Sequence, residues 1–173
     1  MYGRYRQGYE LRDLLMTASL STFAATNLAF SLAPALAGDG DDGFAIWAAA
    51  GGRLLGAALM ALAAVTADRP LRRPQVAFRR AMAGCFAFLG VLALVVAVAG
   101  DALPRAVDAG LSPDDVDSPR IVGNATILSA QLVTTGLFAI AAAGFGRRAG
   151  RTGDELAGWL AVAATLGAFA ALN

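Results

Sequence analysis

The apolar residues of this chain form five long blocks separated by short charged segments, and they do not alternate as in a half-buried strand. The blocks cover approximately residues 14–36, 44–67, 81–99, 121–145 and 156–172. At about 1.5 Å per residue, each block can cross a hydrocarbon core of about 30 Å, the third and the fifth only just. The pattern predicts an all-α integral membrane protein, a single bundle of about five transmembrane helices within residues 1–173.

The composition agrees with this prediction. Hydrophobic residues make up 57% of the chain and charged residues 16%, compared with roughly 45–50% and 25% in soluble domains. Histidine is absent, which excludes a histidine base and any histidine-ligated metal or haem. The single Cys85 lies inside an apolar block and has no cysteine partner in the chain. We therefore expect no metal and no cofactor.

The arginines predict the orientation of the helices. Every basic residue is Arg, and 11 of the 14 lie in the N-terminal segment, in residues 68–80 or in residues 147–151. These three segments fall on one side of the membrane if five helices alternate, and the arginine-rich side is normally cytoplasmic. The two remaining connections are rich in Asp. The sequence therefore predicts a multi-pass protein of a bacterial cytoplasmic membrane with a cytoplasmic N-terminus, the arginine bias being typical of a high-GC genome.

The first apolar block has an alternative interpretation as a cleavable signal peptide. The basic N-terminus and the Ala35-Leu-Ala37 triplet fit that alternative. The block is longer than the apolar region of a usual signal peptide, and Tyr2, Tyr5 and Tyr9 are typical of an interfacial anchor. These features favour a retained helix.

Arg53 is the residue most indicative of function. It lies about 14 Å along the second predicted helix, where an Arg costs about 2.5–3.5 kcal/mol on the insertion scale. At 100° per residue, Arg53 shares a helical face with small residues that include Gly52 and Gly56. We therefore expect Arg53 to point into the bundle, either to bind an anionic or carbonyl-bearing ligand or to hold helices together. A lipid-facing Arg is the alternative.

Other polar residues are candidates for the same site. Asn27 lies in the outer half of the first predicted helix. Asn124, Gln131 and Thr135 fall within about 40° of one another on one face of the fourth. Amides and hydroxyls in membrane helices also serve as structural contacts between helices, so both interpretations remain open for each residue.

No pattern in the chain indicates catalysis. The sequence contains no G-x-S-x-G, no P-loop, no H-E-x-x-H and no pair of acids inside a predicted helix. We therefore expect no enzymatic activity and no catalytic residue. The arginine clusters lie in connections where they set orientation, so nucleic-acid binding is not expected either.

The overall layout resembles the N-terminal membrane-embedded sensor regions of bacterial, especially actinobacterial, sensor histidine kinases. The resemblance lies in Arg69–Pro74, in Gly51–Leu55 and in the closing Gly158–Asn173 segment. It implies detection of a signal by the membrane region and an output through a kinase or cyclase module. That module is missing from this sequence, which is the main departure from the family pattern.

Three functions therefore remain: a sensory region without its output module, a small transport or channel component, and a structural assembly subunit. Expected partners are the lipid bilayer and a downstream signalling module or partner subunit, and self-association remains open. Five crossings from a cytoplasmic N-terminus place Asn173 outside, and no interfacial residues follow the fifth block. We therefore expect the native protein to continue into a further helix.

Overall fold

The structure, a computed structural model, describes residues 10–33, 42–99 and 125–172, and within these ranges it contains helices and short connections but no strand. The prediction of an all-α fold is confirmed. The helices are α1 (Leu11–Asn27), continued directly by the π-helix η2 (Leu28–Leu32), then α3 (Asp42–Val65), α4 (Pro74–Ala99), α5 (Ala125–Thr152) and α6 (Glu155–Leu172).

Four of these helices, α1 with η2, α3, α4 and α5, are long and apolar enough to cross a membrane. Helix α6 is also apolar but shorter. Large apolar side chains cover the outside of the bundle, and Leu94 and Val98 on α4 are 64% and 81% exposed. Since a soluble protein rarely exposes a continuous apolar surface of this kind, the chain is a membrane protein.

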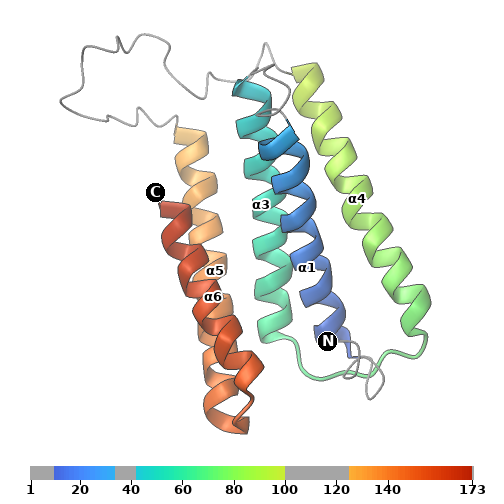
Figure 1. Cartoon of the computed structure of the whole chain (residues 1–173), viewed down its shortest axis with the longest axis vertical. Helices are drawn as coiled ribbons and strands as arrows, with labels where there is room; N and C mark the ends of the chain where they lie inside the picture. The colour runs from blue at the N-terminus through green and yellow to red at the C-terminus, as the bar shows by residue number, and fades with distance from the viewer. Residues whose placement is uncertain (1–9, 34–41, 100–124, 173) are drawn as a thin grey trace, which may run out of the picture.

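Successive helices run in opposite directions (Figure 1). Helix α3 packs against α1 and α5, α6 pairs with α5, and α4 lies at one edge beside α1 and α3. The beginning of α1, the α3–α4 connection and the α5–α6 turn therefore lie at one end of the bundle. We call this the arginine-rich end, defined by Arg12, Arg69, Arg72, Arg73, Arg79, Arg80, Arg147, Arg148 and Arg151.

Small residues allow the central helices to approach closely. A Cβ added at Gly52 would lie 3.0 Å from the Thr26 Cβ, and one added at Gly144 would lie 2.8 Å from the Ala64 Cβ. The first contact joins α3 to α1 and the second joins α5 to α3. Because lipid tails provide no hydrophobic drive for helix association, such close backbone contacts are a main source of stability. The predicted packing of the Gly52-x-x-x-Gly56 face is confirmed.

Helices α4 and α5 extend furthest beyond their predicted ends, by about two turns each. Helix α4 begins at Pro74 and includes Arg79 and Arg80, whereas the sequence pattern predicts these two residues in the connection. Proline is favoured at the first helical position because its missing N–H would be unpaired there in any case. Helix α5 continues past Arg148 to Thr152 and ends at Gly153, whose φ of 65° suits a glycine after a helix. Arginine is a good helix former, so these charges do not end the helices. The predicted segments at 34–36 and 121–124 lie outside the described residues.

Candidate functional site

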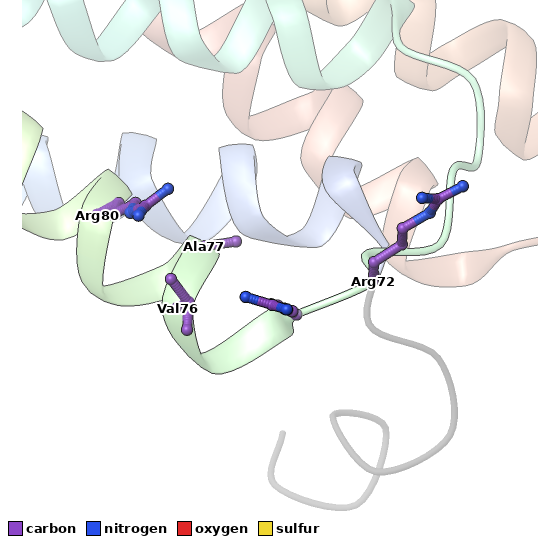
Figure 2. Close-up of a pocket in the computed structure, with 5 residues that line it drawn as sticks. Arg72, Val76, Ala77 and Arg80 are labelled. Carbon is purple, nitrogen blue, oxygen red and sulfur yellow. The ribbon is translucent and has the colours of Figure 1, made fainter.

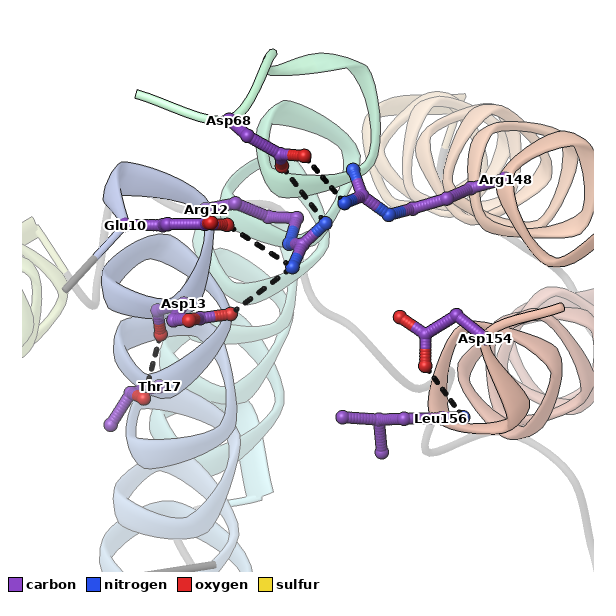
Figure 3. A network of polar contacts seen from close by, with 8 residues as sticks. All are labelled: Glu10, Arg12, Asp13, Thr17, Asp68, Arg148, Asp154 and Leu156. Atoms are coloured by element: carbon purple, nitrogen blue, oxygen red, sulfur yellow. Dashed lines mark hydrogen bonds and ion pairs between the residues drawn. The ribbon is translucent and has the colours of Figure 1, made fainter. Parts of the chain in front are cut away.

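Asp68 joins three elements at the arginine-rich end. Its Oδ1 accepts a hydrogen bond from Arg12 Nη1 at 3.0 Å, and its Oδ2 accepts one from Arg148 Nη2 at 2.6 Å (Figure 3). Arg12 is also ion-paired with Glu10 at 3.3 Å and with Asp13 at 3.6 Å. One carboxylate therefore connects α1, the α3–α4 connection and α5. We call these five residues the Asp68 junction.

The pKa of Glu10 is raised within this junction. Burial is the largest cause, followed by the negative charge of Asp68, while Arg12 acts in the opposite direction. The protonated form of Glu10 is therefore favoured beside the negatively charged Asp68.

A backbone contact supports the same connection. Leu11 N donates a hydrogen bond to the Arg69 carbonyl oxygen at 2.9 Å, and Glu10 forms an isolated antiparallel bridge with Pro70. The residue before α1 and the residues after α3 are therefore held together by backbone as well as by charge. The position of the α3–α4 connection is fixed relative to the beginning of α1.

The prediction that Arg53 points into the bundle is wrong, because its side chain is exposed. The small residues that share its predicted face, among them Ala49, Gly52 and Gly56, are buried as expected. Arg53 forms no ion pair with any residue in the described ranges. In a membrane, the Arg53 side chain therefore lies on the outer side of α3, where it faces lipid or a partner.

Contacts between helices define which residues lie at the depth of Arg53. Gly52 of α3 contacts Thr26 of α1. Arg53 and Asn27 directly follow these two residues in the chain, so they lie at a similar depth. Phe23 contacts Gly56 and stacks on Phe138, with ring centroids 5.7 Å apart. Since α3 and α5 run in the same direction, residues one turn before Phe138 lie near the level of Gly52 (Figure 1). These are Thr134 and Thr135. We call Thr26, Asn27, Arg53, Thr134 and Thr135 the Arg53 level.

The candidate companions of Arg53 differ in their surroundings. Asn27 and Gln131 are exposed, and Asn124 lies outside the described residues. Thr135 is half-buried, and its Oγ1 is buried without a hydrogen-bond partner in the described part of the chain. The structure thus places Asn27 and Thr135 at the depth of Arg53 but records no direct bond between them. Asn27 is also the last residue of α1 before η2, and short π-helical segments often occur at functional sites.

A buried polar line on α1 was missed in the sequence. Ser19, Thr22 and Thr26 are almost fully buried, with exposed fractions of 0%, 1% and 0%. Ser19 Oγ donates to the Gly56 carbonyl oxygen at 2.8 Å, whereas Thr26 Oγ1 is buried without a described partner. Their spacing of three and four residues on an apolar helix was the available signal, since small hydroxyl residues mark helix contacts in membranes.

Within the described ranges, no three His, Cys, Asp or Glu side chains come together in a way that could hold a metal ion. The arrangement offers two kinds of chemistry: an exposed cation at mid-span, and a network of opposite charges at the arginine-rich end. Comparisons of the chain with protein families, with curated proteins and with solved structures found no match.

Proposed function

We propose that this protein is the membrane-embedded sensory region of a bacterial signalling protein, with the arginine-rich end in the cytoplasm and its output in a separate module. The observation that carries the proposal is the exposed Arg53 at mid-span, without an acidic partner in the described residues. A cation at this depth is costly and normally serves a ligand, a partner or a conduction path. Its ligand or partner is therefore an anion or a carbonyl-bearing group that approaches α3 from outside the bundle.

The Asp68 junction supports a route from that position to the cytoplasm. Helix α3 carries Arg53 in its first half and leads directly into the connection that holds Asp68. A shift of α3 moves Asp68 relative to Arg12 and Arg148, which belong to α1 and α5. Because each charge pair is partly exposed, exchanging one partner for another costs little, as a switching element requires.

Binding at Arg53 is tested by the thermal stability of the purified protein. A ligand that binds only the folded state raises the melting temperature. We expect at least one member of a panel of small carboxylates and phosphates to stabilise the wild type but not the Arg53→Leu variant. Leu62→Ala is the control, because Leu62 is exposed on the same helix and carries no charge. An identical ligand profile for wild type and Arg53→Leu counts against the proposal.

Coupling to the arginine-rich end is tested by spin labels in lipid nanodiscs. Gln75 at the beginning of α4 and Thr152 at the end of α5 are exposed positions for labels in a Cys85→Ala background. We expect Arg53→Leu to change the distance distribution between these labels and Leu62→Ala to leave it unchanged. If Asp68→Asn changes the distribution and Arg53→Leu does not, the junction is an independent structural contact and the relay is refuted.

A small transport component is the second candidate function. The π-helical segment η2 directly after Asn27 favours it, because transporters place their sites at irregular helices. Reconstituted vesicles distinguish the two functions. Anion flux that depends on Arg53 would establish transport, whereas ligand binding without flux supports the sensory function.

A further inference from the structure

Three arginines that form no ion pair with any described residue line a pocket at the beginning of α4. The pocket has a volume of about 460 Å³ and is lined by Arg72, Arg73, Val76, Ala77 and Arg80 (Figure 2). Arg73 directly precedes α4, and Ala77 and Arg80 follow it at spacings of four and three residues, so the three lie on one side of the beginning of the helix. Arg72 comes from the connection before the helix. The connection and the beginning of α4 together contribute three arginines to the lining of one pocket.

This pocket lacks the neutralising acids present at the Asp68 junction. Arg12 and Arg148 are paired with Asp68, but no ion pair in the described ranges involves Arg72, Arg73 or Arg80. No Asp or Glu occurs anywhere between Arg69 and Ala99. The positive charge of this segment is therefore uncompensated within the described part of the protein.

The position of these arginines at a helix N-terminus makes the need for an anion stronger. The first turn of α4 carries no acidic residue. The N-terminal end of a helix has a partial positive charge, so cations there are unfavourable and an anion is favourable. Arg72 and Arg73 directly precede Pro74, the first residue of α4. An anion in the pocket would offset both the guanidinium charges and the positive end of the helix.

The pocket also has an apolar side that continues along α4. Val76 is 43% exposed, and further along the helix Phe86, Val91 and Leu94 are 55%, 59% and 64% exposed. A group held by the arginines could therefore extend an apolar tail along the outer face of α4. Phospholipids combine these two properties, and basic pockets at the ends of transmembrane helices bind their headgroups.

We propose that the pocket formed by Arg72, Arg73, Val76, Ala77 and Arg80 binds the phosphate-bearing headgroup of an anionic phospholipid. Guanidinium groups bind phosphate oxygens through paired hydrogen bonds, and three arginines line this pocket. The acyl chains lie along the exposed apolar face of α4. The lipid then fixes the depth of this helix, which lies at the edge of the bundle (Figure 1).

The test measures lipid binding to the purified full chain by native mass spectrometry, with phosphatidylglycerol and phosphatidylcholine as probes. We expect the wild type to prefer phosphatidylglycerol. The triple variant Arg72→Gln, Arg73→Gln, Arg80→Gln should weaken its binding by about tenfold or more, because each arginine near a membrane contributes substantially to binding anionic lipid. The matched control is Arg79→Gln, Arg147→Gln, Arg151→Gln, which removes the same charge from exposed positions outside the pocket.

Each outcome bears on the proposal. Equal losses in the two triple variants would mean that general surface charge attracts the lipid, and the pocket would be rejected. Displacement of phosphatidylglycerol by inorganic phosphate at similar concentrations would identify a free-phosphate site and also overturn it. If the pocket triple variant does not fold by circular dichroism, the single variant Arg80→Gln is compared with Arg79→Gln. A wild type without preference for phosphatidylglycerol refutes the proposal directly.

Discussion

Asp68 and Arg148 are 80 residues apart in the chain, yet Asp68 Oδ2 and Arg148 Nη2 lie 2.6 Å apart. The contact joins the end of α3 to the end of α5, and Arg12 Nη1 approaches the other oxygen of the same carboxylate at 3.0 Å. The side chain of Asp68 is 44% exposed, so each pair retains some contact with water. The contact therefore acts chiefly to set the relative positions of three helix ends, and less as a source of stability.

We predict that Asp68→Asn lowers the free energy of unfolding by about 1 kcal/mol, because it removes two partly exposed ion pairs. Chemical denaturation in mild detergent measures the effect. High salt should reduce the difference in unfolding free energy between wild type and variant, since exposed charge pairs are screened. Glu155→Gln is the control, an exposed carboxylate at the same end of the bundle. A loss that does not change with salt would show that Asp68 acts through packing and not through charge.

The raised pKa of Glu10 predicts a pH dependence. Burial and the charge of Asp68 favour the protonated carboxyl in the folded state. The folded protein then binds the proton more strongly than the unfolded chain does, so stability is lost as pH rises from the ordinary value of 4.5 through the raised pKa. We expect Glu10→Gln to reduce this part of the pH dependence, as measured by melting temperature between pH 4 and pH 8. Asp13→Asn is the comparison. An unchanged pH profile in Glu10→Gln would contradict the assignment.

Close packing of α5 on α3 predicts a large effect from one methyl group. A Cβ at Gly144 would lie 2.8 Å from the Ala64 Cβ and 3.0 Å from the Ala64 carbonyl oxygen. Because a backbone atom cannot move aside easily, Gly144→Ala should destabilise the protein by about 1–3 kcal/mol. Gly136 lies on the same helix with nothing within 4 Å of an added Cβ. Gly136→Ala should therefore be neutral or slightly stabilising, as alanine is the better helix former. Equal effects of the two variants would contradict this packing.

The approximate positions of the helices along the chain were predictable because the arginine clusters separate blocks of apolar residues. The buried face of α3 was also predictable, since Gly52 and Gly56 recur at the spacing of close helix contacts. The orientation of the Arg53 side chain could not be predicted from the sequence. A helical wheel gives the direction of each residue, but the exposure of a long side chain also depends on where along α3 each neighbour packs. Helix α1 contacts Gly52 and Gly56, while α5 contacts Ala64 near the other end.

The Asp68 junction could not be derived from the sequence for a related reason. The pattern placed Arg12, Asp68 and Arg148 at the same end of the bundle, which the structure supports. It did not indicate which acid would meet which arginine, because that depends on the lateral order of helices. Arg148 lies on α5 because this helix continues through its arginines, whereas the sequence pattern predicts a connection there. The proline at the start of α4 and the glycine after α5 are the sequence signals that mark the first residue of α4 and the last residue of α5.

The last prediction concerns which side of the membrane each end occupies. Because Asp68 contacts both Arg12 and Arg148, the beginning of α1, the α3–α4 connection and the end of α5 must lie on the same side. Reporter fusions after Arg12, near Arg73 and near Arg148 should therefore all read the same, and the arginine bias predicts that they read cytoplasmic. Fusions near Asp41 and Asp114 should read external. Reducing the bias by replacing Arg72, Arg73, Arg79 and Arg80 with Gln should weaken the preference without changing the agreement among the three sites. A disagreement between Arg73 and Arg148 in the unmodified chain would rule out the observed arrangement of helices.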